Sequence, residues 1–211
     1  SLRDLITVIE AYQSKSYHLG FGKNVTRSNL SKANENRNYI IFEDFANHLI
    51  LIAQEKNCND SFEIKGNIYA FDSSTIDLCL SVFWWAHFRK TKAGIKLHTL
   101  FDINTQIPVF IHITEANIHD VNAMDIINYE PFAYYIFDRA YVDYLRLYRI
   151  TKSTAYFVVR AKSNLKFRRM YSKKTDKSTG VIYDQTGKID GFYTSKDYPE
   201  KIRKVKFFDA E

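Results

Sequence analysis

Two short hydrophobic runs, each leading into an aspartate, constrain the fold more than any other feature. Residues 66–78 read Gly-Asn-Ile-Tyr-Ala-Phe-Asp-Ser-Ser-Thr-Ile-Asp-Leu, and residues 134–141 read Tyr-Tyr-Ile-Phe-Asp-Arg-Ala-Tyr. Short runs rich in aromatic and β-branched residues predict buried strands. Each run ends in an acid, Asp72 in the first and Asp138 in the second. Each acid is therefore expected where the chain leaves the core.

The two acids predict a metal site if their strands are neighbours. Asp72 and Asp138 would then converge at one edge of the sheet. Two nearby carboxylates repel each other unless a proton or a cation lies between them. Carboxylate oxygens are ligands that suit Mg²⁺ or Mn²⁺. We therefore expect these two residues to be both metal ligands and catalytic groups.

The order of the predicted elements brings the two acids together. Strands are predicted over 68–76, 95–103, 109–115, 134–137 and 156–160, and helices over 121–129 (with Asp120 as cap) and 142–152. The order β-β-β-α-β-α-β predicts an α/β fold with a mixed sheet. Its first three strands form an antiparallel meander, and its later strands lie parallel to the first. The fourth strand is then expected beside the first.

The flanking segments differ in character from this α/β core. Helices are predicted over residues 2–12, from about residue 26, and over 38–54, with Thr26 or Ser28 as a cap. A helix-turn-helix in which residues 27–29 touch DNA is one interpretation, and packing or linker structure is the commoner one. After residue 162 we expect only short β segments, at 166–171, 180–184, 191–193 and 202–208. The predicted division is a helical N-terminal segment at 1–62, the core at 63–162 and a basic β-rich insertion at 163–211.

Positive charge is concentrated after the second acid. Residues 1–138 hold 12 Lys and Arg against 16 Asp and Glu, whereas residues 139–211 hold 18 against 8, and the whole chain is at +6. A basic face beside an acidic site suits an enzyme that acts on a polyanion. A lysine-rich soluble surface would give the same balance. The phosphate-binding candidates are Lys162, Lys166, Arg168 and Arg169.

Other features narrow the class of protein. No run of 18 or more apolar residues is present, so no membrane span is expected. Cys58 and Cys79 form no CxxC pattern, which fits a reducing cytosol and does not suggest a zinc site. The chain starts at Ser1 in a helical pattern and stops in a strand-like run. We therefore expect it to be a fragment of a longer protein.

Several motifs resemble those of bacterial DDE insertion-sequence transposases, which have a ribonuclease H-like core. The branch in question carries a Tyr-Arg-Glu-Lys signature and a β insertion before its last acid. The matching stretches cover essentially the whole chain: Ser1-Leu2-Arg3-Asp4-Leu5, Tyr17-His18-Leu19-Gly20, Ser28-Asn29-Leu30-Ser31-Lys32-Ala33-Asn34-Glu35, Phe71-Asp72-Ser73-Ser74-Thr75-Ile76, Ile118-His119-Asp120 and Phe137-Asp138-Arg139-Ala140-Tyr141. Ala140 stands where the family often has Gly.

The resemblance implies metal-dependent DNA strand cleavage followed by strand transfer. Asp72 and Asp138 would be the first two acids of the triad, with Mg²⁺ or Mn²⁺ as cofactor. The third acid, a Glu, is expected outside this chain, because no Tyr-x-x-Arg-x-x-x-Glu spacing follows residue 162. Arg139 and Tyr141 would support the acids or contact the DNA backbone, and His119 would be an accessory group.

The resemblance also implies partners and a location. The partners are DNA, both transposon ends and target, and a second copy of the full-length protein on paired ends. The location is the bacterial cytoplasm, in association with the nucleoid. Two other functions stay open from the sequence alone: a nuclease of the same fold that hydrolyses and never joins, and a non-catalytic fragment that binds DNA.

Overall fold

The computed structural model describes residues 2–21, 25–56, 64–79, 86–89 and 92–208. The chain divides into two compact units, Ser1–Ile52 and Ala53–Glu211, and each is described by itself. The predicted division at residues 62 and 162 stays a prediction. Cys58 lies outside the described residues, and Cys79 is exposed.

The first unit is helical. It contains α1 (Leu2–Ala11), α2 (Gln13–Ser16), α3 (Arg27–Asn36) and most of α4 (Ile40–Lys56). Thr26 caps α3, because its side-chain oxygen accepts a hydrogen bond from the Asn29 amide at 3.3 Å, which decides between the two predicted caps. The short helix α2 was not predicted.

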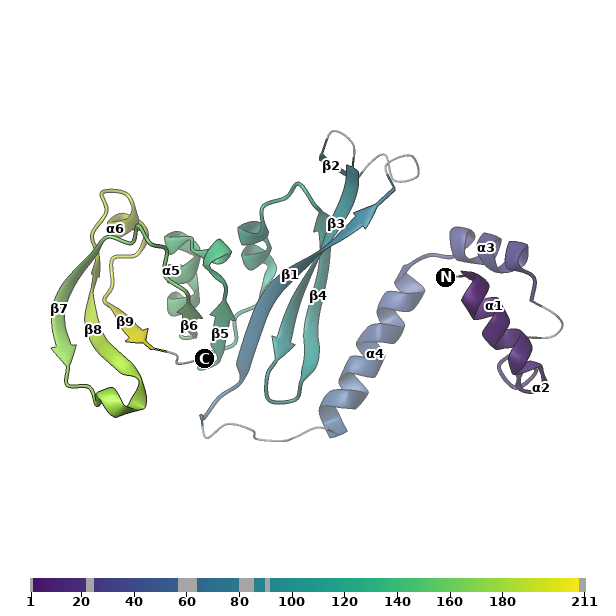
Figure 1. Cartoon of the computed structure of the whole chain (residues 1–211), viewed down its shortest axis with the longest axis horizontal. Helices are drawn as coiled ribbons and strands as arrows, with labels where there is room; N and C mark the ends of the chain where they lie inside the picture. The colour runs from purple at the N-terminus through teal and green to yellow at the C-terminus, as the bar shows by residue number, and fades with distance from the viewer. Residues whose placement is uncertain (1, 22–24, 57–63, 80–85, 90–91, 209–211) are drawn as a thin grey trace. The chain divides into compact units, whose positions relative to one another are not determined.

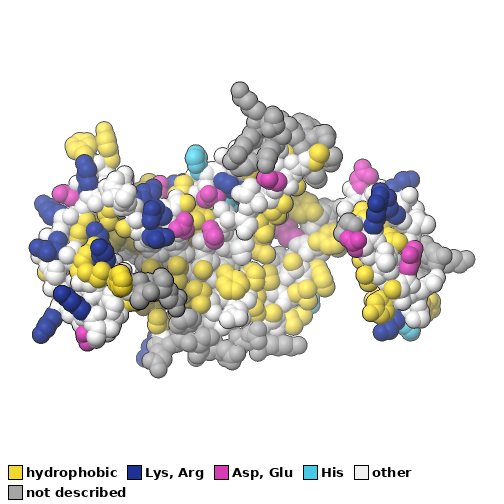
Figure 2. Space-filling view, viewed as in Figure 1, with side chains coloured by type: hydrophobic (Ala, Val, Ile, Leu, Met, Phe, Trp, Pro, Cys, Tyr) yellow, Lys and Arg dark blue, Asp and Glu magenta, His cyan; other side chains and the backbone are white. Residues whose placement is uncertain are grey.

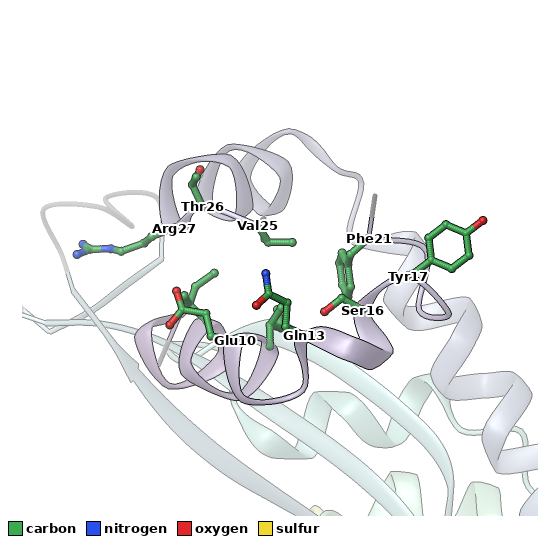
Figure 3. Close-up of a pocket in the computed structure, with 10 residues that line it drawn as sticks. Glu10, Gln13, Ser16, Tyr17, Phe21, Val25, Thr26 and Arg27 are labelled. Atoms are coloured by element: carbon green, nitrogen blue, oxygen red, sulfur yellow. The ribbon is translucent and has the colours of Figure 1, made fainter. Parts of the chain in front are cut away.

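An open groove of about 1120 Å³ lies within this helical unit. Glu10 of α1 and Gln13 of α2 line one side, and Val25 and Thr26, just before α3, line the other (Figure 3). None of the described residues of α1, α2 or α3 is buried. The helix-turn-helix interpretation of this unit stays a prediction.

A mixed sheet forms the centre of the second unit (Figure 1). Its strands are β1 (Ile68–Leu78), β2 (His87–Arg89), β3 (Lys92–Asp102), β4 (Ile107–Glu115), β5 (Tyr134–Phe137) and β6 (Tyr156–Val159). The order is β2-β3-β1-β5-β6, and β4 also pairs with β3. β3 is antiparallel to β1 and β4, whereas β5 is parallel to β1 and β6. The predicted meander and the predicted parallel strands are confirmed.

β1 and β5 are paired in the register that the predicted site needs. Ile68 pairs with Tyr134 and Phe71 with Phe137. The next residue along each strand is an acid, Asp72 in one and Asp138 in the other. The strand predicted over 68–76 is confirmed as β1, which continues past Asp72 and ends two residues later than predicted, at Leu78. Its antiparallel pairing with β3 persists beyond the point where β5 stops.

The main core lies on one face of the sheet, under η1 (Asp120–Ile126), η2 (Arg139–Tyr141) and α5 (Tyr144–Lys152). Phe71, Tyr135, Phe137, Tyr141 and Ile150 are all at most 4 % exposed. The segment predicted as a helix over 121–129 is a 3-10 helix, and no side chain caps it. The predicted helix over 142–152 is confirmed as α5, which the Asp143 side chain caps by accepting from the Arg146 amide at 3.0 Å.

A second, antiparallel sheet follows residue 162. It consists of β7 (Phe167–Lys173), β8 (Val181–Ile189) and β9 (Ile202–Phe207), with η3 (Lys177–Thr179) and α6 (Thr194–Asp197) between them. Buried Ile189 and Tyr198 belong to the same hydrophobic cluster as the main core. The Tyr198 ring meets the rings of Tyr148 and Phe157, so the connection between β8 and β9 packs against α5 and β6.

The β segment predicted at residues 191–193 is absent. These residues form a bend and turn that leads into α6. The aromatic side chains of Phe192 and Tyr193 favour a strand by propensity, but they are 74 % and 75 % exposed. A strand needs a neighbouring strand to pair with its backbone, and β7, β8 and β9 pair only with one another in the described chain.

Candidate metal and DNA site

Asp72 and Asp138 are both exposed to solvent on neighbouring strands. The Asp72 carboxylate accepts a hydrogen bond from the amide of Ser73, at 2.8 Å from Oδ1. Asp138 follows β5 directly, and its backbone carbonyl accepts from the Tyr141 amide at 3.1 Å, which closes the η2 turn. The side chains are therefore open to a ligand while the backbone that carries them is held by strand and turn hydrogen bonds.

Tyr141 packs directly beneath the two acids. Its ring centroid lies 5.3 Å from that of Phe71 and 5.9 Å from that of Phe137, the residues that precede Asp72 and Asp138. Tyr141 is 1 % exposed. A direct contact of this side chain with DNA does not fit that burial, whereas support of the acids, the other expected role, does.

The hydroxyl of Tyr141 lies in acidic surroundings. Burial raises the pKa of Tyr141 to about 12, and the carboxylates of Asp120, Asp72 and Asp138 act in the same direction. The Ser73 side chain lies near enough to act against this rise in pKa, but none of the described residues makes a hydrogen bond of ordinary geometry to the buried hydroxyl oxygen. The phenol is therefore neutral at pH 7.

The side-chain contacts of Asp120 were not predicted from the sequence. Asp120 was expected to cap a helix, but its carboxylate Oδ1 accepts a hydrogen bond from the Ser73 hydroxyl at 2.9 Å. The same oxygen lies 3.1 Å from the Lys96 ammonium nitrogen. The spacing of Asp120 from Asp72 in the sequence gives no indication that the two regions meet. The only sequence signal for a role of Asp120 was its position in the stretch 118–120, which resembles the transposases.

The two histidines nearest these residues differ in environment. His98 is fully buried, its Nε2 lies 2.9 Å from the Thr114 hydroxyl, and burial lowers its pKa, so it is neutral at pH 7. His119 is exposed, and its side chain makes no hydrogen bond with a described residue. The accessory role expected for His119 therefore stays a prediction.

The predicted DNA-binding cations are exposed. Arg139 follows Asp138 directly in η2, and Lys162 donates a hydrogen bond to the Val142 carbonyl at 3.2 Å. Lys166, Arg168 and Arg169 are exposed at the start of the second sheet. Lys and Arg side chains gather over β7, β8 and β9 in the space-filling view (Figure 2). Sequence reasoning did not single out Lys188, which pairs with Arg168 across β7 and β8.

The donors at the candidate site fit a hard divalent cation. Asp72 and Asp138 offer four carboxylate oxygens between them, and the carboxylate of Asp120 is already held by Ser73 and Lys96. Mg²⁺ is commonly held by one or two carboxylates together with phosphate oxygens of the substrate. Within the described ranges no group of three or more His, Cys, Asp or Glu side chains is arranged to hold a metal by itself. A metal at this site would therefore depend on further ligands.

Comparison with known proteins agrees with the class that the fold and the paired acids define. The family model described as "Transposase DDE domain" matches residues 63–207. The chain is 29 % identical over 181 residues to the protein named "Putative transposase y4zB" of Sinorhizobium fredii, which covers 83 % of this chain and 49 % of that protein. No solved structure matches. None of the described helices is long and apolar enough to cross a membrane.

This chain belongs to the DDE transposase family, and its mixed sheet is that of a ribonuclease H-like core. It spans about half the length of the curated relative it matches.

Proposed function

We propose that this chain forms the catalytic core of a DNA transposase that cleaves strands at insertion-sequence ends and transfers them to target DNA. The observation that carries the proposal is the register of β1 and β5, which makes Asp72 and Asp138 the residues that follow a directly paired Phe71 and Phe137. Two exposed carboxylates on adjacent parallel strands are suited to share divalent cations.

In this proposal Asp72 and Asp138 hold Mg²⁺ or Mn²⁺ through their carboxylate oxygens. When bound, such ions stabilise charge on the attacking and leaving oxygens of an in-line displacement at phosphorus. The Ser73 amide orients the Asp72 carboxylate through its 2.8 Å hydrogen bond. Tyr141 fixes the backbone beneath both acids by packing on Phe71 and Phe137. Arg139, next to Asp138, is positioned to contact a DNA phosphate.

The second sheet is proposed to bind the DNA backbone. Arg168 and Lys188 lie directly opposite each other on β7 and β8. Like charges in this position destabilise a sheet, and a bound polyanion removes that repulsion. Together with Lys162, Lys166 and Arg169 they form what we call the basic strip. Transposon ends and target DNA are the proposed partners. A homodimer on paired ends and a cytoplasmic, nucleoid-associated location are proposed from the family alone.

The reaction distinguishes a transposase from the two other functions. The transposase that contains these residues is expected to nick a labelled transposon-end duplex in Mg²⁺ and then join the 3′ end to a target plasmid. Nicked products that are never joined would favour a nuclease of the same fold. A protein that binds the duplex equally well with both acids replaced by Ala, and never cleaves it, would be a non-catalytic binding module.

DNA binding by the basic strip is expected to weaken steeply with salt. Each neutralised phosphate contributes about −0.9 to the slope of log K against log salt concentration. The double variant Arg168→Gln/Lys188→Gln, which changes two residues directly opposite each other, should therefore make the slope shallower by about 2. Fluorescence anisotropy of a labelled duplex between roughly 50 and 200 mM salt measures this. An unchanged slope would remove these two residues from the DNA-contacting surface. Lys15→Gln is a single-charge control outside the second sheet.

A further inference from the structure

We propose that Asp120 is a positioning residue for the metal site, acting through Ser73 on the Asp72 carboxylate. The inference rests on the proposed function of Asp72. Its contacts form a continuous path, from Lys96 to Asp120, from Asp120 to Ser73 and from Ser73 to Asp72. No part of this path needs Asp120 to touch the metal.

Ser73 is the link between the two acids. Because successive side chains of a strand point to opposite faces, the Ser73 side chain points away from the face of Asp72. Its amide still reaches Asp72 Oδ1 at 2.8 Å, while its hydroxyl donates to Asp120 Oδ1 at 2.9 Å. Ser73 is thus held from the core side and itself holds the carboxylate on the exposed side. A shift of Ser73 moves the donor that fixes the Asp72 rotamer.

Asp120 is in turn fixed from β3. The Lys96 ammonium lies 3.1 Å from Asp120 Oδ1 and donates a second hydrogen bond to the Ile118 carbonyl at 2.6 Å. The side chain of Lys96 is only 13 % exposed and that of Asp120 is 28 % exposed. Solvent and salt screen such a partly buried pair less than a surface pair. Lys96, which lies opposite Thr75 on β3, therefore holds the loop before η1 against the sheet.

The position of this path favours a role in the site over a general role in folding. On β3, Lys96 pairs with Thr75 and the neighbouring His98 pairs with Ser73, the residue after Asp72. The Asp120 carboxylate also lies close enough to the Tyr141 hydroxyl to raise its pKa, as do Asp72 and Asp138. Groups that hydrogen-bond to the residues around a metal ligand typically change metal affinity about 10–100-fold when removed. Removing a group from an ion pair elsewhere in the fold should change the free energy of unfolding and leave the metal affinity unchanged.

Mn²⁺ affinity of the whole chain tests the inference. Free Mn²⁺ is measured by electron paramagnetic resonance as the protein is titrated, for wild type, Ser73→Ala, Asp120→Ala and Asp120→Asn. We expect Ser73→Ala and Asp120→Ala to weaken Mn²⁺ binding about 10-fold or more. Asp120→Asn keeps an oxygen that can accept from Ser73, so it should recover much of that loss. Urea unfolding of each variant reports stability separately.

Asp125→Ala is the matched control. Asp125 forms ion pairs with Arg146 at 2.6 Å and Arg149 at 2.7 Å in the same unit, and it is not part of the path. It should lower stability and leave Mn²⁺ affinity unchanged. If Asp120→Ala were to fail to fold, Ser73→Ala and Asp120→Asn would carry the test.

The outcomes separate the inference from the function on which it rests. Wild-type affinity in both Ser73→Ala and Asp120→Ala overturns the positioning role and leaves the metal site intact. An equal loss in Asp125→Ala also overturns it, because the effect would then follow stability. If the wild type is folded and Asp72→Ala binds Mn²⁺ with the same affinity as the wild type, the proposed metal site and the inference are both overturned.

Discussion

Asp138→Asn is expected to abolish DNA cleavage by the transposase that contains these residues. Asparagine has the same shape as aspartate, so the buried strand before it and the η2 turn after it should be unchanged. The change removes the negative charge that holds a divalent cation, and metal stabilisation of the transition state amounts to several kcal/mol. The rate of strand nicking should fall by about 10³-fold or more.

The measurement is single-turnover nicking of a labelled transposon end in Mg²⁺, with circular dichroism to establish that the variant is folded. Asp143→Asn is the matched control. Asp143 lies five positions further on and caps α5, a role that Asn fills as well as Asp. It should retain cleavage within a few-fold. A rate for Asp138→Asn within about tenfold of wild type would contradict the catalytic assignment, because so small a change corresponds to only about 1.4 kcal/mol.

Tyr141→Ala is expected to lower the free energy of unfolding by about 3–5 kcal/mol. The ring is 1 % exposed and meets both Phe71 and Phe137, so truncation leaves a cavity at the centre of the core. Domains of this kind are stable by only about 5–15 kcal/mol, so the variant should be close to unfolding. Urea denaturation followed by near-UV circular dichroism measures the loss.

Tyr141→Phe separates the ring from its hydroxyl. The hydroxyl oxygen is buried without a hydrogen-bond partner in the described part of the chain. Removing an unsatisfied polar group should be neutral or stabilising by up to about 1–3 kcal/mol. A loss of stability as large as that of Tyr141→Ala would mean that the hydroxyl, and not the packing of the ring, holds the two acidic strands together.

The order and pairing of the strands were predictable because the hydrophobic runs that form them are short, local and clearly bounded in the sequence. Runs such as Tyr134–Phe137 have few alternatives to a buried strand, and the alternation with helices then determines which strands are parallel. The same pattern predicted β1 as far as residue 76. Only its last two residues, Asp77 and Leu78, lie beyond the predicted end, and they pair with Gly94 and Ala93 of β3.

The contacts of Asp120 and the turn at 191–193 depended on tertiary structure. An acid before a helical pattern predicts a cap, and nothing local indicates that its carboxylate meets Ser73, which lies 47 positions earlier in the sequence. Phe192 and Tyr193 have strand propensity, but a strand also needs a partner. The candidate acids were predictable because each follows an unmistakable hydrophobic run, 68–71 before Asp72 and 134–137 before Asp138. The group that supports one of them was found only in the fold.

The most direct test is a crystal structure of this chain grown or soaked with Mn²⁺, with anomalous diffraction to locate the metal. We predict an anomalous peak between the carboxylates of Asp72 and Asp138, with oxygens of both residues coordinated to the metal. Carboxylates on unrelated edges of the sheet, or Mn²⁺ bound elsewhere while both side chains stay unliganded, would contradict it. The chain would then remain a member of the transposase family without the metal site on which the proposed chemistry depends.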